Sequence, residues 1–230
     1  MNMSADFPYN PLDKVNLGKS VAEALLGRKP HRLDSLATFQ GADIYALCYL
    51  GPHRAYGRLT ALNQTDDPQA PIYVGKAIPA GARKGVPAAA QAAASKALFQ
   101  RLLEHAESLR SAGSLNLSDF KCRWLTVDDI WIPLGESLLV AMFSPVWNTL
   151  VDGFGNHDPG SGRYAGLRPR WDILHPGRLW AERCKASAET AEQIEAEVVA
   201  WLDAEPSLAR SRFLIEQAAA RYRTESEKLQ

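Results

Sequence analysis

The alternation of apolar and polar residues predicts three strands in this chain. The runs 42–51 and 71–77 are short and apolar and end at or near a glycine, which is typical of buried strands. The segment between them, 51–70, holds Asn, Asp and Pro residues and indicates a loop, so the two runs form a hairpin with a long connection. The run 120–127 alternates apolar and basic residues, which predicts a half-buried strand with Arg123 on its polar face.

Apolar residues at helical spacing predict the remaining elements, which lie at 17–27, 92–110, 130–143 and, as two helices, 187–228. Gly27 is a stop signal for the first helix, and Asp129 can cap the third. Thr190 and Gln193 match a capping box, and Pro206 stands where the last helix would begin. The chain therefore combines a few short strands with several amphipathic helices.

The order strand, strand, helix, strand, helix predicts an α/β (α+β) domain in which a small antiparallel sheet is flanked by helices. We divide it into an N-terminal arm and helix (1–41), a core (42–148), an irregular segment (149–185) and C-terminal helices (186–230). A chain of 230 residues is long enough to bury one sizeable core, and we expect a single domain. The irregular segment is rich in glycine and arginine, and a loop this long is usually functional.

Composition excludes several classes of protein. Hydrophobic residues make up 46% of the chain and charged residues 23%, as in ordinary globular proteins, which argues against wholesale disorder. No apolar stretch approaches the roughly 18 residues of a membrane span, and the N-terminus lacks the apolar region of a signal peptide. Cys48, Cys122 and Cys184 are odd in number and widely spaced, which favours free thiols over disulfides. We therefore predict a protein of the cytoplasm with no membrane contact.

The charge is balanced overall but uneven along the chain. The 26 basic and 26 acidic residues give a net charge of zero, which argues against a generic binder of polyanions. Residues 76–123 nevertheless hold eight basic against three acidic side chains, and residues 151–185 hold six against four. The segment 186–230 is acidic, with five against nine. The neutral total therefore excludes only an indiscriminate nucleic-acid binder. A protein that searches for one sequence is helped by weak non-specific binding to phosphates, and its basic segments can still contact DNA.

Six polar residues in the core stand out against the apolar pattern: Tyr45, Tyr73, Arg101, His105, Glu136 and Asn148. Arg101 and His105 are four residues apart and share one helix face. Glu136 interrupts an otherwise apolar helix, where a carboxylate is costly unless it is paired or bound to a metal. Each residue alone has an ordinary structural explanation, such as packing for a strand tyrosine or a turn role for an asparagine. Their joint order is what indicates a functional site.

That order resembles the GIY-YIG nuclease superfamily over residues 42–148. The two tripeptides that define the superfamily correspond to Asp-Ile-Tyr at 43–45 and Tyr-Val-Gly at 73–75, and the six polar residues follow in the family's order. Two features depart from the family: Asp43 replaces a glycine, and the two tyrosines are 28 residues apart, so that 51–70 is an insertion. The segments 153–163 and 167–181 are similar to the GIY-YIG restriction endonucleases that cut CCGCGG.

The resemblance implies a Mg²⁺-dependent nuclease specific for a DNA sequence. Tyr45 would be the general base, Arg101 and Tyr73 would bind the phosphate, and Glu136 would hold a single Mg²⁺, for which Mn²⁺ can substitute. A free tyrosine has a pKa near 10, which is poorly matched to neutral pH, so Tyr45 needs a cationic neighbour or a proton relay.

Two residues are candidates for that help, and a third for holding the site together. His105 and Lys76 could each orient Tyr45 or depress its pKa, although a lysine at a strand end is equally well explained as a solvated side chain. Asn148 would fix the geometry through hydrogen bonds. All three are implied by the resemblance or by their place beside the tyrosines, and their roles are expectations.

Recognition of a GC-rich site requires donors that reach base edges, most often arginine on guanine. The candidate DNA-binding residues lie in two loops: Arg83, Lys84, Asn156, His157, Arg163, Arg168, Arg170 and Arg178. A palindromic site fits a homodimer acting on double-stranded DNA, and a methyltransferase that modifies the same site is implied in the prokaryotic host. Two alternatives stay open: a repair or structure-specific nuclease of the same superfamily, and a non-catalytic DNA-binding module.

Overall fold

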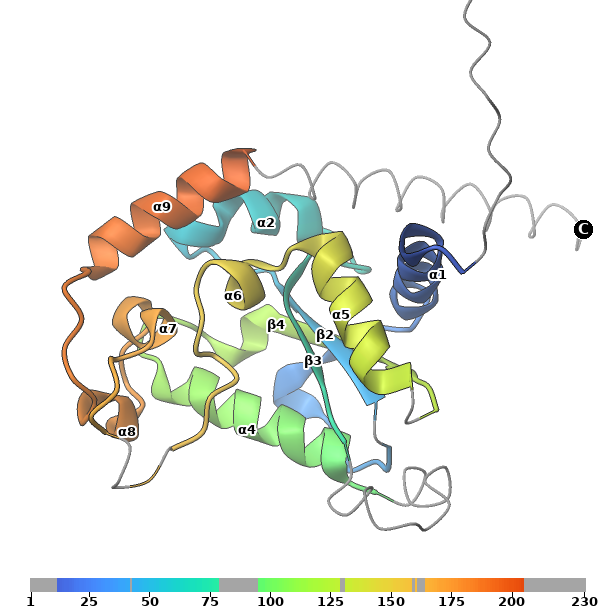
Figure 1. Cartoon of the computed structure of the whole chain (residues 1–230), viewed down its shortest axis with the longest axis horizontal. Coiled ribbons are helices and arrows are strands. Elements are labelled where there is room, and N and C mark those ends of the chain that lie inside the picture. The colour runs from blue at the N-terminus through green and yellow to red at the C-terminus, as the bar shows by residue number, and fades with distance from the viewer. Residues whose placement is uncertain are drawn as a thin grey trace, which may run out of the picture.

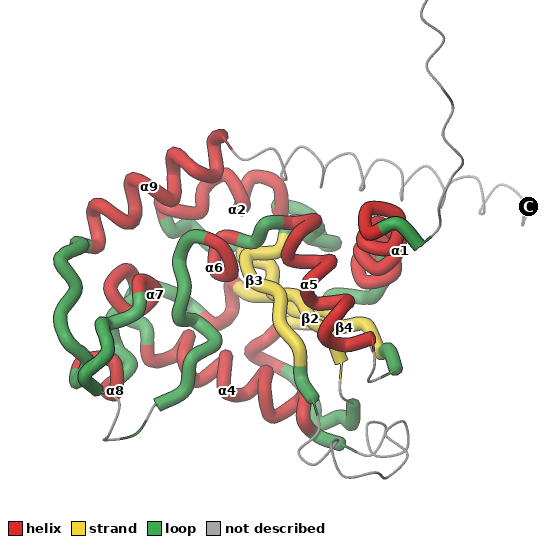
Figure 2. The backbone as a smooth tube through the Cα atoms, in the orientation of Figure 1, coloured by secondary structure: helices red, strands yellow, loops and turns green. Residues whose placement is uncertain are grey.

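The computed structural model describes residues 12–41, 43–78, 95–128, 131–158, 160 and 164–204. Within them a four-stranded antiparallel sheet lies between helices, as Figures 1 and 2 show. The sheet has the order β1-β4-β2-β3, formed by β1 (His31–Arg32), β2 (Asp43–Tyr49), β3 (Pro71–Lys76) and β4 (Phe120–Thr126). The predicted mixed fold with a small antiparallel sheet is confirmed.

The described helices surround this sheet. They are α1 (Lys14–Leu26), α2 (Gly57–Asn63), α4 (Ala97–Ser111), α5 (Ile132–Phe143), α6 (Val146–Thr149), α7 (Arg170–Leu174), α8 (Leu179–Glu182) and α9 (Ala191–Ala204), with short 3₁₀ turns at Leu33–Ser35, Arg54–Tyr56 and Leu117–Asp119. Helices α1, α4 and α5 lie where helical spacing predicts them. In the part of the chain that the structure describes, no helix is both long and apolar enough to cross a bilayer.

The two faces of the sheet carry separate apolar cores, because side chains of a strand alternate between faces. Tyr45 and Leu47 of β2 pack in the cluster that includes α4, whereas Ile44 and Ala46 pack in the cluster formed with α1 and α5. Figure 1 shows α1 and α5 on one side of the strands and α4 on the other. A Cβ at Gly135 of α5 would lie 2.3 Å from Ile44 Cδ1, so glycine permits this close packing of helix on sheet.

The segment 51–70 is not the loop that its polar residues predict. It contains a 3₁₀ turn and α2, because Tyr56 and Leu59 are buried against the rest of the protein. The amide of Asn63 closes the end of the insertion: its Nδ2 donates to the carbonyls of Tyr49 and Ala70, and its Oδ1 accepts from the Ala70 N–H. Tertiary packing thus overrides the local turn signals.

Strand β4 also departs from the predicted alternation. Arg123 is buried rather than solvated, and its guanidinium donates to the carbonyls of Leu26 and Pro68 and to the Asp67 carboxylate. The polar face of the strand is therefore covered at Arg123, where two carbonyls and one carboxylate accept from the Nη groups, whereas Nε is buried without a hydrogen-bond partner.

Further predictions concern the ends of helices, the tail, the cysteines and the segment 150–185. The capping box at the start of α9 is confirmed, since the Thr190 N–H donates to Gln193 Oε1 and the Gln193 N–H donates to Thr190 Oγ1. The predicted cap Asp129 and the second tail helix at Pro206 lie outside the described residues. The three cysteines are free, as predicted, and two of them are buried. The segment 150–185 is less irregular than predicted, since α7 and α8 form within it.

Candidate active site

Four of the six expected residues meet on the α4 face of the sheet. Antiparallel register pairs Tyr45 with Gly75 and Leu47 with Tyr73, which places both tyrosines on this face. Helix α4 brings Arg101 and His105 to the same place from one of its faces. The ring centroids of Tyr73 and His105 are 5.2 Å apart, and those of Tyr45 and Tyr73 are 6.2 Å apart.

Tyr45 and His105 form a buried hydrogen-bonded pair. Tyr45 Oη lies 2.6 Å from His105 Nε2, and the two residues are 0% and 1% exposed. Burial raises the pKa of Tyr45 well above its ordinary value and lowers the pKa of His105 well below its ordinary value. Burial therefore favours the neutral form of both side chains, and the His105 tautomer decides which of them donates the hydrogen bond.

The glycine of the second tripeptide makes this pair possible. A Cβ at Gly75 would lie 2.4 Å from Tyr45 Oη and 2.6 Å from Tyr45 Cζ. Any side chain on the neighbouring strand at this point would push the tyrosine ring away from His105. The motif thus needs a glycine for space across the strand pair rather than for a special backbone angle.

Arg101 lies at the opening of the site, where it joins α4 to the segment 153–158. Its side chain is 20% exposed, and it donates to Glu104 Oε2 at 2.9 Å and to the carbonyl of Gly155 at 2.7 Å. A ring nitrogen of His157 also contacts its Nη1. A Cβ at Gly155 would lie 2.7 Å from Tyr73 Oη, so only glycine lets the backbone approach this closely.

Sequence reasoning gave no role to Phe154, yet it covers the site from the same segment. Its ring stacks on His105 with centroids 4.5 Å apart and an interplanar angle of 14°, and it meets the edge of Tyr73 at 5.0 Å. The signal in the sequence was the aromatic residue between two glycines at 153–155, directly after the core. The Phe154 ring thus covers one side of His105, and burial is the largest cause of the lowered pKa of that imidazole.

Glu136 and Lys76 form an ion pair on the other face of the sheet. Lys76 lies opposite Ile44 in the register, and its Nζ is 2.6 Å from Oε2 of Glu136 on α5. The expectation that Lys76 helps Tyr45 directly does not match this placement, since Lys76 comes three positions after Tyr73 and strand alternation sends it to the opposite face. Glu136 still acts on Tyr73 at a distance: burial is the largest cause of the raised pKa of Tyr73, and the charge of Glu136 adds to it while that of Arg101 opposes it.

Asn148 on α6 binds the edge of the sheet. Its Oδ1 accepts from the Val74 N–H and its Nδ2 donates to the Val74 carbonyl, both at 2.8 Å. Because β3 is an edge strand of the described sheet, these backbone groups would otherwise have no strand to pair with. The asparagine therefore holds β3 between the two groups of site residues.

The donor set suits a hard divalent cation held by one protein carboxylate. Among the described residues, no three or more His, Cys, Asp or Glu side chains are grouped so that they could hold a metal. Glu136 is partly exposed, and a single carboxylate is enough for Mg²⁺, which keeps several waters and accepts phosphate oxygens.

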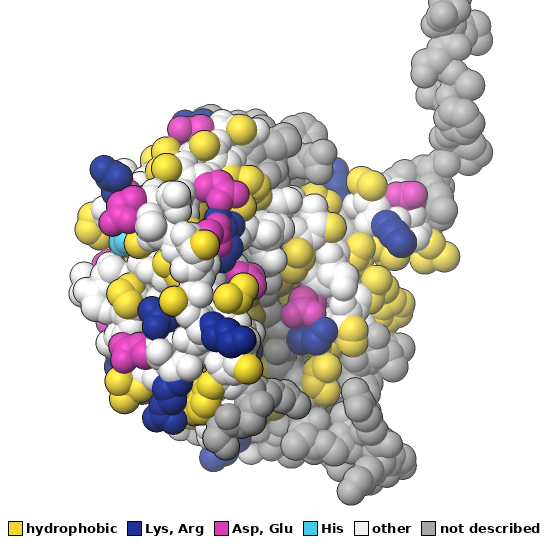
Figure 3. Space-filling view, turned by 60° about the vertical axis from the view of Figure 1, so that its left-hand side comes forward, with side chains coloured by type: hydrophobic (Ala, Val, Ile, Leu, Met, Phe, Trp, Pro, Cys, Tyr) yellow, Lys and Arg dark blue, Asp and Glu magenta, His cyan; other side chains and the backbone are white. Residues whose placement is uncertain are grey.

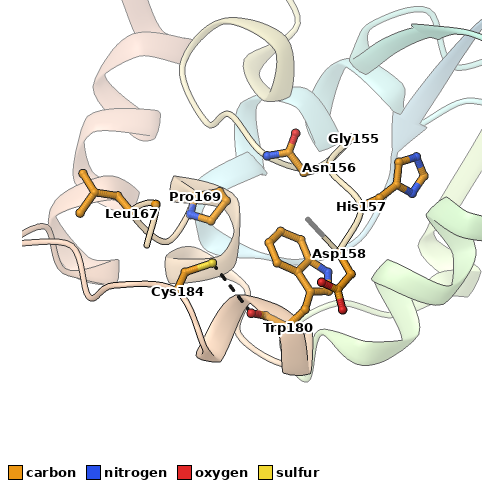
Figure 4. Close-up of a pocket in the computed structure, with 9 residues that line it drawn as sticks. Gly155, Asn156, His157, Asp158, Leu167, Pro169, Trp180 and Cys184 are labelled. Carbon is orange, nitrogen blue, oxygen red and sulfur yellow. Dashed lines mark hydrogen bonds between the residues drawn. The ribbon is translucent and has the colours of Figure 1, made fainter. Parts of the chain in front are cut away.

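The candidate DNA-binding residues separate into three groups. Arg83, Lys84 and Arg163 lie outside the described residues. Asn156 and His157 are exposed, and they line a surface pocket of about 470 Å³ with Asp158, Leu167, Pro169 and Trp180, which Figure 4 shows. Figure 3 shows basic and acidic side chains interspersed on the face that it presents.

The third group consists of arginines whose donors are used inside the protein. Arg168 donates to the carbonyls of Ala181 and Glu182, and Arg170 donates to the Leu150 carbonyl and binds acidic side chains of the α9 region. Arg178 is 5% exposed and fully bonded within the chain, so we no longer expect it to contact DNA.

The antiparallel sheet, the helix arginine and histidine, and the two strand tyrosines define a nuclease domain of the GIY-YIG class. A family model described as the Eco29kI GIY-YIG domain matches residues 37–202, and the chain belongs to this family of restriction endonucleases. The match extends past the core into the arginine-rich segment and α9. No curated protein matches the chain.

Proposed function

We propose that the protein is a type II restriction endonuclease that hydrolyses phosphodiester bonds of double-stranded DNA at a GC-rich palindrome, CCGCGG. The observation that carries this proposal is the meeting of Tyr45, Tyr73, Arg101 and His105 at one point, with Glu136 within electrostatic reach. The choice of site comes from the resemblance of 153–163 and 167–181 to enzymes that cut it.

Arg101 and Tyr73 would hold the scissile phosphate. In the DNA-free protein, Arg101 Nη2 donates to the Gly155 carbonyl oxygen. A phosphate oxygen carries a negative charge and is a stronger acceptor, so it could take the place of this carbonyl. The Tyr73 hydroxyl lies beside Gly155 and would add a second donor. Planar guanidinium donors suit the negative charge that grows on the phosphate during attack.

Tyr45 would take a proton from the attacking water while its own hydroxyl proton passes to His105 Nε2. This relay avoids a free phenolate, which the raised pKa of Tyr45 disfavours. It requires the His105 tautomer with an unprotonated Nε2. The bound phosphate would favour the proton on His105, since a nearby negative charge raises the pKa of an imidazole.

Glu136 would hold one Mg²⁺, with Mn²⁺ as a substitute. When bound, the cation supplies charge stabilisation to the phosphate and to the leaving 3′ oxygen. Lys76 would have to share or release the Glu136 carboxylate. The palindrome implies a homodimer with one site per strand, in the cytoplasm of a prokaryotic cell that also holds a methyltransferase for the same sequence.

Digestion of plasmid DNA with Mg²⁺, followed by mapping of the fragment ends, tests the proposal. Fragments that end within CCGCGG are expected, and Glu136→Ala should bind the same DNA without cutting it. Preferential cutting of branched DNA would indicate a structure-specific nuclease instead. Binding of duplex DNA with no cutting under any metal condition would indicate a non-catalytic module.

A further inference from the structure

Arg178 is the most fully bonded cation of the described residues. Its Nε and Nη2 bind both oxygens of Asp172 at 2.6 and 2.5 Å. Its remaining donors bind three backbone carbonyls of one short segment, those of Gly153 at 2.9 Å and of Phe154 and Asn156 at 3.1 Å. Every N–H of the guanidinium thus has an acceptor.

The surroundings of Arg178 show that this arrangement is built into the protein. The side chains of Arg178 and Asp172 are 4% and 1% exposed. The guanidinium carbon lies 4.5 Å from the ring centroid of Trp171 and 4.8 Å from that of Trp180. A buried charge is tolerated only when it is paired and hydrogen-bonded, and here both conditions are met.

The segment that Arg178 binds is also the segment that covers the active site. Of its four carbonyls at 153–156, three face Arg178, whereas the carbonyl of Gly155 accepts from Arg101. The Phe154 side chain stacks on His105. Two guanidinium groups, one structural and one in the site, therefore hold opposite sides of the same stretch of backbone.

We propose that Arg178, oriented by Asp172, is a positioning residue of the active site. It fixes the segment 153–157 so that the Gly155 carbonyl orients the Arg101 guanidinium and the Phe154 ring shields His105 from water. It acts through these neighbours and does not touch DNA. The expected effect of Arg178 on cleavage rests on the proposed nuclease function, whereas its expected effect on the pKa of His105 does not.

Only an arginine can fill this role, because five donors in a rigid plane match a carboxylate on one side and three carbonyls on the other. Lysine keeps the positive charge and has three donors on one nitrogen, so Arg178→Lys releases part of the segment. The matched control is Arg123→Lys. Arg123 is equally buried and also binds carbonyls and an aspartate, but it lies on β4 and contacts none of residues 153–157 through its donors.

The first measurement is steady-state cleavage of duplex DNA that holds the site. Arg178→Lys should lower kcat about 100-fold, the loss expected when catalytic groups shift by about 1 Å, with KM changed by less than about threefold. Arg123→Lys should lower the unfolding temperature without this loss of kcat. A raised KM with unchanged kcat would make Arg178 a DNA contact and overturn the proposal, as would a kcat no lower than that of Arg123→Lys.

The second measurement needs no activity: NMR titration of His105, assigned by comparison with His105→Gln. The titratable groups that face this imidazole are Tyr45 and Tyr73, and the charges of Arg101, His157 and Arg178 also act on it. Because lysine keeps that charge, a higher His105 pKa in Arg178→Lys reports that Phe154 has moved and water has entered. An unchanged His105 pKa overturns the proposal, even if the wild-type protein cuts no DNA.

A second variant covers the case in which Arg178→Lys does not fold. Asp172→Asn keeps the shape of the partner and leaves Arg178 in place, and it should give a smaller loss of kcat and a smaller rise of the His105 pKa. A variant that folds and leaves both quantities at wild-type values would overturn the proposal.

Discussion

The side-chain amide of Asn148 and the backbone of Val74 exchange two hydrogen bonds of 2.8 Å, so one residue of α6 stands in for a neighbouring strand at the edge of β3. One bond pairs the backbone donor of Val74 with the amide oxygen, and the other pairs its backbone acceptor with the amide nitrogen. The stability of this edge should therefore depend on the amide rather than on side-chain size.

Asn148→Asp tests this dependence. The carboxylate can still accept from the Val74 N–H, but it has no donor for the Val74 carbonyl, and the two oxygens would repel each other. We expect the free energy of unfolding to fall by about 1–3 kcal/mol, as for other unsatisfied partly buried groups. Urea denaturation of Asn148→Asp and Asn148→Ala checks it. Wild-type stability in the aspartate variant would show that the edge does not need the donor.

Gly75→Ala should separate Tyr45 from His105. The new methyl group would lie 2.4 Å from Tyr45 Oη, and neither the tyrosine nor the strand has free space to yield. We expect a loss of about 1–3 kcal/mol from overpacking and a large loss of cleavage.

The matched control for this substitution is Gly57→Ala, where a Cβ would meet nothing within 4 Å at the start of α2. It should be neutral or slightly stabilising, because alanine is the better helix former. Thermal unfolding of both variants is the measurement. Equal stabilities of Gly75→Ala and Gly57→Ala would mean that the close contact across the strands is not required.

Stability should fall in mildly acidic solution because two histidines are buried as neutral groups. Burial lowers the pKa of His105 and His175 well below the ordinary value of 6.5. As pH falls through about 6.5 the unfolded chain takes up protons that the folded chain does not, so the free energy of unfolding falls by roughly 1 kcal/mol per pH unit for each histidine.

Urea denaturation between about pH 7 and 5.5 measures this slope. Asp43 and Asp172 contribute with the opposite sign: burial raises their pKa, so at lower pH the folded protein binds protons there more readily than the unfolded chain does. Stopping the titration at about pH 5.5 keeps this contribution small. His53 and His31, whose pKa burial also lowers, add smaller contributions of the same sign, so His175→Gln should lower the slope by less than half. A stability that is flat or rises toward acid would contradict the buried neutral histidines.

Local signals account for most elements of the fold, whereas partners distant in sequence decide the rest. Apolar runs and caps predict β2, β3 and α9, because alternation and capping act over a few residues. They do not predict α2 or the burial of Arg123, which depend on carbonyls and side chains brought together only by the fold. A buried arginine and a solvated one look the same in a sequence.

The candidate site divides in the same way. The six polar residues were identified by their order, and the structure brings four of them together. The parity of β3 already separates Lys76 from Tyr73, since residues three apart in a strand face opposite sides. Phe154 carried only the weak signal of an aromatic residue between two glycines, and the role of Arg178 had none, because a backbone segment that bridges two guanidinium groups becomes visible only in three dimensions.

The ion pair between Lys76 and Glu136 predicts how a metal would bind. A divalent cation at Glu136 must compete with the Lys76 ammonium 2.6 Å away. Since this pair is partly exposed and worth at most about 1 kcal/mol, Lys76→Met should tighten binding of Mn²⁺ by about two- to fivefold. Glu136→Gln should abolish specific binding.

Titration of the DNA-free protein with Mn²⁺, followed by electron paramagnetic resonance of the free ion, measures both effects without any cleavage assay. Lys121→Met is the control for loss of one positive charge, because the Lys121 ammonium binds the Asp66 carbonyl rather than Glu136. It should change the affinity less than Lys76→Met does. Weaker Mn²⁺ binding in Lys76→Met would show that the lysine supports the metal site instead of competing with it, and unchanged binding in Glu136→Gln would place the cation elsewhere.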